Sequence, residues 1–270
     1  MKRALTAVAL SVGLIVLSGP WSVVIADDDD DDNDHRLQAV PATFVGKAGD
    51  CGTGYPAGSR IVTSAWLGGM GLPDNGGQNV GSEPKDNPNK QDPHLGLLLS
   101  KNGTTADCSA AEAEITGVEG ITVNAEFHLG FDYRNGGHCG AGAPRFDVSY
   151  RQPDGTDGSS FVGGCSNDHQ PTGAPQDPAQ WTRVRFETSD QTESFPPIPQ
   201  GSRIKSISIA FDEGTDTANN DTEGVGLAVL DNIDINGRLI TRGTGIADGI
   251  NRDKYKNDKD GDDKKKHDRD

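Results

Sequence analysis

The sequence has few basic residues: 25 Lys and Arg stand against 41 Asp and Glu, for a formal net charge of -16. A protein this acidic repels nucleic acid and anionic lipid surfaces, because phosphate binding needs clustered Lys and Arg side chains. The deficit therefore predicts that nucleic acid is not a partner. Loss of Lys2 and Arg3 with a cleaved leader would remove two positive charges and take the net charge to -18.

Motifs of common enzymes are also missing. The chain has no GxSxG elbow, no HExxH pair and no P-loop, and no two cysteines are close enough for a CxxC zinc knuckle. A glycoside hydrolase needs only two carboxyl groups across a cleft, and Glu112, Glu114 and Glu126 are candidates for that role. The absences favour a non-catalytic protein and leave a polysaccharide-active hydrolase or lyase as an alternative.

Long apolar runs are confined to the N-terminus. Met1-Lys2-Arg3 leads into an apolar run from Ala4 to Leu17, followed by a Gly19-Pro20 break and then Ala26. This order predicts a secretory signal peptide over residues 1–26 and a secreted protein, extracellular or periplasmic. A transmembrane anchor is the alternative, but a spanning helix needs about 20 uninterrupted apolar residues. We therefore expect no membrane span.

Two charged segments flank the expected domain. Residues 27–35 are mostly Asp, and residues 246–270 combine many Asp with many Lys and Arg and almost no apolar side chains. Such segments cannot bury a core, so both are expected to be disordered tails. The ordered body is then expected at 36–245, a length that suits one all-β domain.

Within that body, apolar side chains recur at every second position. The pattern runs from Ile121 to Phe131 and returns at 146–150, 184–186 and 207–211. A period of two is the spacing of a strand with one buried face. Together with the Gly-, Pro- and Asn-rich turns between the runs, it predicts an all-β antiparallel sandwich or jelly roll.

Two segments depart from this alternation. Residues 225–235 are apolar on both sides, which predicts a central strand. Residues 109–115 contain three alanines that favour helix, but Gly117 and Gly120 cut the segment short. We interpret it as a short turn or a strand entry.

The chain has only four cysteines: Cys51, Cys108, Cys139 and Cys165. An even number in an exported chain predicts disulfides, with three possible connectivities. The turn Pro153-Asp154-Gly155 predicts a hairpin, and Cys139 and Cys165 flank it. If the hairpin forms, these two pair, which leaves Cys51 with Cys108.

The segment from Val229 to Gly237, with Asp231-Asn232-Ile233 at its centre, resembles the closing strand of jelly-roll carbohydrate-binding modules and galactose-binding-like domains. The segment from Gln180 to Phe186 is similar to the Trp-led strand that often precedes it. The resemblance covers the second half of the body. It implies a carbohydrate-binding sandwich in which the closing-strand Asp, here Asp231, helps to hold a structural calcium.

Physical chemistry leaves two roles open for Asp231. An ionised carboxylate in an apolar strand needs a cation or several hydrogen bonds to offset its desolvation. Asp231 is thus either a calcium ligand or a carboxylate that accepts bonds from amides. Asp212 and Asp216 lie in a second group of oxygen ligands between two strands, where the alternative is a solvated acidic loop.

Side chains suited to a sugar gather at one expected strand end. Sugars present apolar C–H faces and many hydroxyls, so aromatic rings beside planar polar groups recognise them. The candidates for this site lie between positions 132 and 138, and they are Asp132, Tyr133, Arg134, Asn135 and His138. Tyr133 and His138 are expected to be exposed, whereas Trp66 and Trp181 are expected in the core.

These observations favour a secreted, non-catalytic module that binds an extracellular carbohydrate or cell-surface ligand, with one structural calcium. A structural or matrix protein whose sandwich serves as a spacer is the alternative from another class, beside the hydrolase or lyase.

Overall fold

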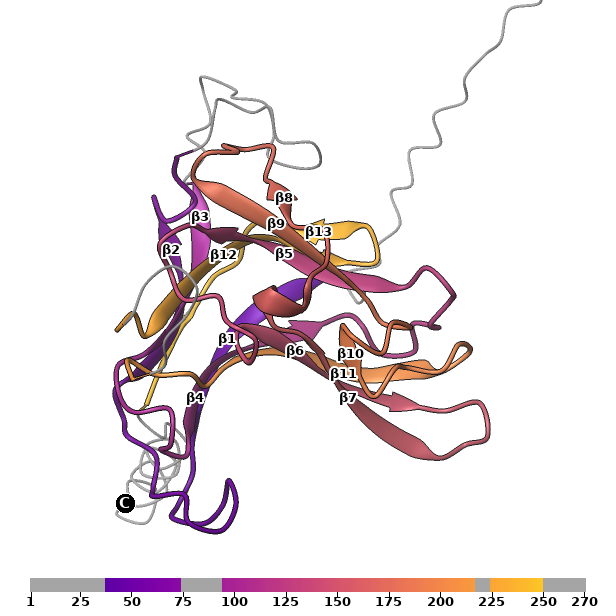
Figure 1. Cartoon of the computed structure of the whole chain (residues 1–270), viewed down its shortest axis with the longest axis horizontal. Helices are drawn as coiled ribbons and strands as arrows, with labels where there is room; N and C mark the ends of the chain where they lie inside the picture. The colour runs from indigo at the N-terminus through magenta and orange to yellow at the C-terminus, as the bar shows by residue number, and fades with distance from the viewer. Residues whose placement is uncertain (1–36, 74–93, 217–223, 250–270) are drawn as a thin grey trace, which may run out of the picture. The chain divides into compact units, whose positions relative to one another are not determined.

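The structure, a computed structural model, describes residues 37–73, 94–216 and 224–249. Within these ranges the chain forms an antiparallel β-sandwich of two sheets (Figure 1), as the alternating pattern predicted. The first sheet has six strands in the order β1 (Gln38–Val45), β4 (Ser109–Thr116), β11 (Arg203–Phe211), β6 (Arg145–Arg151), β7 (Asp157–Gly163) and β10 (Ser194–Phe195).

The second sheet has eight strands. Its order is β14 (Ile246–Asp248), β2 (Val62–Gly68), β3 (Leu95–Lys101), β12 (Leu227–Ile235), β5 (His128–Arg134), β9 (Trp181–Glu187) and β8 (Thr172–Gly173), with β13 (Arg238–Ile240) also paired to β12. A single 3-10 turn, η1 (Cys165–Asn167), is the helical element of the described residues. The chain passes repeatedly from one sheet to the other, with β4, β6 and β11 in the first and β5, β9 and β12 in the second, which is a jelly-roll pattern.

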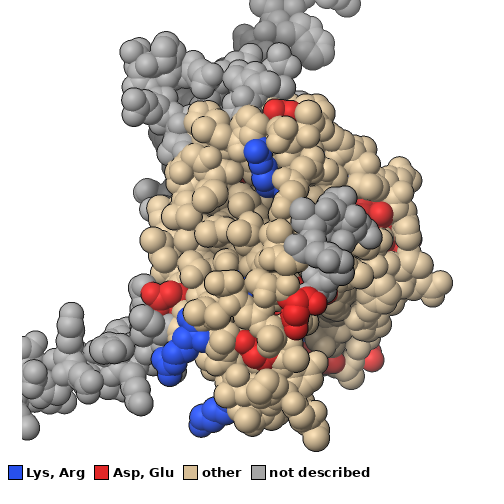
Figure 2. All heavy atoms as spheres, turned by 60° about the vertical axis from the view of Figure 1, so that its left-hand side comes forward, with Lys and Arg blue, Asp and Glu red and all other residues tan. Residues whose placement is uncertain are grey.

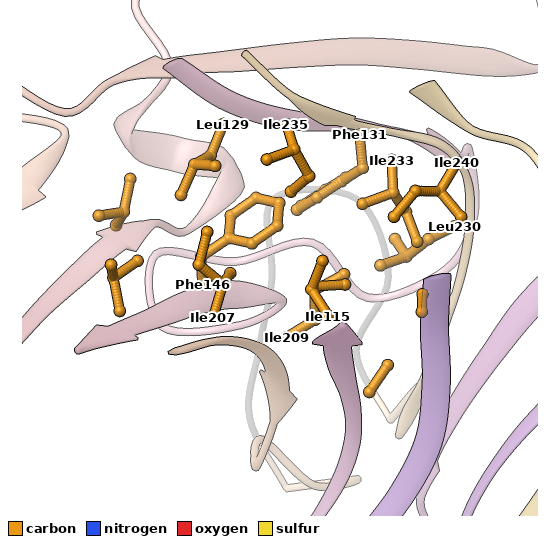
Figure 3. Packing of buried hydrophobic residues seen from close by; sticks show 14 of the residues in the cluster. Ile115, Leu129, Phe131, Phe146, Ile207, Ile209, Leu230, Ile233, Ile235 and Ile240 are labelled. Carbon is orange, nitrogen blue, oxygen red and sulfur yellow. The ribbon is translucent and has the colours of Figure 1, made fainter. Parts of the chain in front are cut away.

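The core lies between the inner faces of the sheets. Phe131, Leu230 and Ile233 from the eight-stranded sheet face Phe146 and Ile209 from the six-stranded sheet (Figure 3). All five side chains are fully buried. Because side chains alternate along a strand, the neighbours of these core residues mostly face the outer side of their sheet, among them Asp132 on β5 and Asp234 on β12.

Several sequence predictions are confirmed. β12 lies between β3 and β5, so residues 227–235 are a central strand. β6 and β7 pair across the turn at 152–156, and the disulfides are Cys51–Cys108 and Cys139–Cys165. The described residues include no helix long and apolar enough to span a membrane.

Other boundaries were wrong. Residues 109–116 form a full strand, β4, because the small Ala111 and Ala113 side chains fill the core face between β1 and β11. The expected strand from Ile121 begins only at His128, since residues 121–127 bury Val123 and Phe127 in irregular backbone.

The body also extends past its expected end at 245. β14 pairs with β2, and the Thr43 hydroxyl donates to the Asp248 carbonyl at 2.7 Å, so residues 246–249 belong to the domain and not to a tail. The predicted signal peptide, the acidic segment 27–35 and the rest of the C-terminal segment lie outside the described residues.

Candidate functional site

Ionised side chains lie on the outer face of the eight-stranded sheet, opposite the core. β5 contributes Asp132, β12 contributes Asp234, and β9 contributes Arg183 and Arg185. In register, Asp132 stands between Asp231 and Arg183, while Gly130 stands between Asp234 and Arg185. The pairing therefore brings two acidic strands beside a strand with two arginines on one face. We call these four charged side chains the arginine network.

Arg183 and Asp132 form a two-pronged ion pair. Arg183 donates from Nε to Oδ1 and from Nη2 to Oδ2 of Asp132, both at 2.8 Å. Asp132 is fully buried, whereas 23% of the Arg183 side chain is exposed. Hydrogen bonds from Arg183 satisfy the buried carboxylate, and those to Asp132 raise the pKa of Arg183.

Arg185 reaches the same carboxylates because Gly130 lies beneath it. Arg185 Nε is 2.8 Å from Asp234 Oδ2, and its Nη1 is 3.6 Å from Asp132 Oδ1. A Cβ atom at position 130 would lie 2.5 Å from Arg185 Cδ and 2.4 Å from the Val184 carbonyl oxygen. Glycine is thus required for Arg185 to cross β5.

Asp234 remains ionised despite its burial. Burial by itself raises the pKa of a carboxyl group, but contacts with His128 and Arg185 and a bond from the Gly237 amide bring the pKa of Asp234 below its ordinary value. His128 Nε2 is 3.6 Å from Asp234 Oδ2, and this contact raises the pKa of His128.

A bulge in β12 adds amide groups to the network. The register shifts between Asp231 and Asp234, and Asn232 has a φ of 46°. Its side-chain Nδ2 donates to Asp132 Oδ2 at 2.9 Å and also to Gln176 Oε1. Gln176 is fully buried, so the segment before β9 covers this part of the sheet.

Beside the network lies a groove of about 450 Å³, which we call the polar groove. It is formed by the segment after η1, by β8, by β9 and by the turn that follows β9. Its lining residues are all polar or charged: Asp168, His169, Gln170, Thr172, Arg183, Arg185, Glu187, Asp190 and Glu193.

We call the carboxylates of Asp168, Glu187, Asp190 and Glu193 the acidic wall of the polar groove. Backbone amides donate hydrogen bonds to three of them. Asp168 accepts from the amides of Gln170 at 2.6 Å and Arg185 at 2.9 Å. Glu193 accepts from the Glu187 amide at 2.7 Å, and Asp190 accepts from the Thr192 amide at 2.7 Å. Carboxylates held in this way present fixed oxygen acceptors to a ligand.

The five residues predicted as a sugar site do not form one patch. Asp132 is paired with Arg183. Tyr133 was expected to be exposed, but its side chain is partly buried and packs against the core. The Arg134 guanidinium lies 5.7 Å from the ring centre of Trp181, and Asn135 is at the strand end, where its Oδ1 accepts from Thr182.

His138 was also expected at the surface and is instead fully buried. It hydrogen-bonds to Glu213 through Nε2 and meets the Phe211 ring edge-on. Both tryptophans are buried as expected: Trp66 donates to the Ala39 carbonyl at 2.7 Å and Trp181 to the Pro73 carbonyl at 2.9 Å. Neither indole ring is open for stacking on a sugar.

The three carboxylates proposed as calcium ligands lie in different surroundings. Asp231 accepts from Gln176 Nε2 at 3.3 Å and from the Asn232 amide at 2.7 Å. Asp212 forms a two-pronged pair with Arg145 on the outer face of the other sheet, and Asp216 accepts from the Thr105 amide. In the described part of the chain, no three His, Cys, Asp or Glu side chains are grouped to hold a metal ion.

A lysine takes the oxygens near Asp212. The fully buried Lys101 Nζ donates to the carbonyls of Thr105, Asp107 and Asp212 at 3.2, 3.0 and 2.8 Å, and is 3.1 Å from Asp107 Oδ1. An ammonium group thus occupies an all-oxygen shell of the kind that would also suit a hard cation.

Sequence reasoning missed the arginine network and Lys101. One signal was present: Asp231 and Asp234 interrupt an apolar strand, and Arg183 and Arg185 lie two residues apart on one face of another. Buried carboxylates need cationic or amide partners, so the two patterns belong together. The strand order that joins them has no local signal.

Fold and site together define a class: a disulfide-bonded antiparallel β-sandwich with jelly-roll crossings and a polar groove at one edge of its larger sheet. Comparison with protein-family models, with curated proteins and with solved structures found no match.

Proposed function

We propose that this chain is a secreted, non-catalytic binding module that takes a hydroxyl-rich ligand, such as an extracellular carbohydrate, in the polar groove. The observation that carries the proposal is the lining of the groove, which combines carboxylate acceptors held by backbone amides with the donors of Arg183, Arg185 and Gln170. A hydroxyl group donates one hydrogen bond and accepts others, so a surface that offers both partners suits it.

Buried carboxylates beneath the groove hold its two arginines in place. Arg183 and Arg185 are held from below by Asp132 and Asp234, so their positions are fixed before a ligand arrives. Preorganised donors lose little conformational entropy on binding. Figure 2 shows another side of the molecule, where the charged side chains of the described residues are scattered among uncharged ones.

Secretion is part of the proposal. It is supported by the predicted signal peptide and by the two disulfides, which form in oxidising compartments. Measuring the N-terminal residue of the exported protein tests it, and Asp27 is the expected result.

The ligand is tested with a glycan array of the full chain and two matched variants. Gln170→Ala removes a groove side chain, whereas Gln152→Ala makes the same change in the β6–β7 turn. We expect Gln170→Ala to weaken glycan binding about tenfold with the melting temperature unchanged, and Gln152→Ala to bind like the wild type. Absence of glycan binding, or equal binding by both variants, contradicts the groove as the site.

Structural calcium remains a separate proposal, based on the resemblance of the Asp231 segment. If Asp231 holds calcium, the melting temperature rises with free calcium and falls on chelation, and Asp231→Asn abolishes both responses. The hydrogen bonds of Asp231 supply the alternative, in which chelation leaves the melting curve unchanged. Thermal unfolding with calcium, with magnesium and with a chelator distinguishes the two.

A hydrolase or lyase is favoured by one observation on the other sheet. Burial and the nearby Asp147 raise the pKa of Glu112 to about 7, which suits a general acid or base near neutral pH. Glu112 lies on the outer face of β4, with Arg145 and Asp147 on β6. Polysaccharide cleavage by the wild-type protein that is lost in Glu112→Gln would favour this function over the binding module.

A further inference from the structure

We infer that the polar groove selects a ligand that carries a positively charged amino group, such as an amino sugar with a free amine, over its neutral or acidic counterpart. The inference rests on the proposed function, since it names the ligand class of the same groove. It follows from the balance of charge in the groove.

The groove has more carboxylates than cations. Its lining includes four carboxylates, those of Asp168, Glu187, Asp190 and Glu193, against two arginines and one histidine. Both arginines already face buried carboxylates of the sheet, Arg183 on Asp132 and Arg185 on Asp234. The positive charge of the arginines is therefore matched from below, whereas the basic groups that act on the groove carboxylates are histidines, His128 on Glu187 and His169 on Asp190.

The partners of the acidic wall are mostly neutral. Asp168 and Glu193 accept from backbone amides, and Asp190 accepts from the amide and hydroxyl of Thr192. Bonds from neutral donors fix the oxygens without cancelling the charge, and those from Thr192 hold the pKa of Asp190 below its ordinary value. The ionised form of Asp190 is thus favoured.

Neighbouring carboxylates contribute to a raised pKa of Glu187. Desolvation raises its pKa, His128 lowers it, and Glu193, Glu126 and Asp190 raise it again, with a net rise. Its side chain is exposed at the end of β9, so it is open to a ligand. A cation placed beside Glu187 would relieve this repulsion, whereas a uronate or sulfate group would add to it.

The test compares two ligands that differ only in the amine. The β-1,4-linked disaccharide of glucosamine and its fully N-acetylated counterpart are titrated into the full chain by calorimetry at about pH 6, where the free amine is protonated. We expect the free amine to bind at least about tenfold more tightly at low salt, with the preference shrinking as salt rises.

Matched variants separate the groove from the general acidity of the chain. Glu187→Gln keeps the size of the side chain and removes its charge, so it should abolish most of the preference, whereas Glu114→Gln, on the exposed face of β4, should leave it intact. A preference equal in wild type and Glu187→Gln would come from the net charge of -16 and would overturn the inference.

The remaining outcomes distinguish the inference from the proposed function. Equal or tighter binding of the acetylated disaccharide, weakened by Gln170→Ala, overturns the amine selectivity and leaves the binding module standing. Binding of neither disaccharide, with a neutral glycan bound on the array, has the same meaning. Absence of binding to any glycan overturns both.

Discussion

Two desolvated carboxylates on opposite outer faces of the sandwich have pKa values shifted in opposite directions. Asp234 has His128, Arg185 and the Gly237 amide within reach, and its pKa lies below the ordinary value. Glu112 is also desolvated, but Arg145 beside it is committed to Asp212 and Asp147, and the pKa of Glu112 rises to about 7. Burial is common to both, so the partners decide the sign.

The difference separates a supported network from an unsupported group. On the eight-stranded sheet, the buried Asp132 and Asp234 each pair with an arginine of β9, and Asp231 accepts from the Gln176 amide. On the six-stranded sheet, Glu112 has no hydrogen-bond partner among the described residues, and its nearest charged neighbours are mostly acidic. Asp234 is stabilised in its charged form, whereas Glu112 takes up a proton as the pH falls through about 7.

The largest effect is expected where a buried carboxylate of the eight-stranded sheet loses its arginine partner. Arg183→Met leaves Asp132 fully buried without its two-pronged partner, so the free energy of unfolding should fall by about 3 kcal/mol or more. Denaturant unfolding measures this. Arg151→Met is the control, because its pair with Asp157 is exposed and should contribute little.

The same network gives a sharper test through a double-mutant cycle. Asp132→Asn combined with Arg183→Met should cost less than the sum of the two single changes, because each partner leaves the other unmatched. Additive costs would show that the pair is not coupled.

The second effect concerns Glu112 on the six-stranded sheet. The raised pKa of Glu112 stabilises the fold fully below its ordinary value of 4.5, and that contribution is lost as the pH rises through about 7. Glu112→Gln should therefore raise the free energy of unfolding by about 1 to 3 kcal/mol at pH 8 and change it little at pH 4. Unfolding curves across this range measure it, with the exposed Glu114→Gln as control. A variant less stable at pH 8 would contradict the assignment.

The smallest expected effect has the opposite pH dependence. Because the pKa of Asp234 is lowered, its contribution is present above the ordinary value of 3.8 and is lost as the pH falls through its folded pKa. Asp234→Asn should cost about 1 to 2 kcal/mol at pH 7, and the difference from wild type should narrow in acid. A constant difference at all pH values would show that the charge of Asp234 is not involved.

Local sequence patterns predicted the parts of the fold that depend on neighbouring residues. Alternation marked β6, β9 and β11, the double-sided apolar run marked β12 as central, and one turn led to both disulfide pairs. Patterns failed where tertiary packing overrode propensity. The alanines of β4 form a strand because only small side chains fit its core face, and irregular backbone still buries Phe127.

The site was harder to predict because its members come from distant segments. Asp132 was predicted as a ligand-binding residue, but it is buried, and its partner Arg183, 51 residues away, meets it only through the pairing of β5 with β9. Tyr133 and His138 were placed outside because sequence does not say which face of a strand or loop meets the core.

The sequence by itself thus determined the acidity, the predicted leader, the all-β class and the cysteine pairing, since each rests on composition or on contacts close along the chain. Only the tertiary structure decided which carboxylates meet arginines, where Lys101 takes its oxygens, and that a polar groove lies beside β8 and β9. Those features depend on strand order and register, which join residues that no local pattern connects.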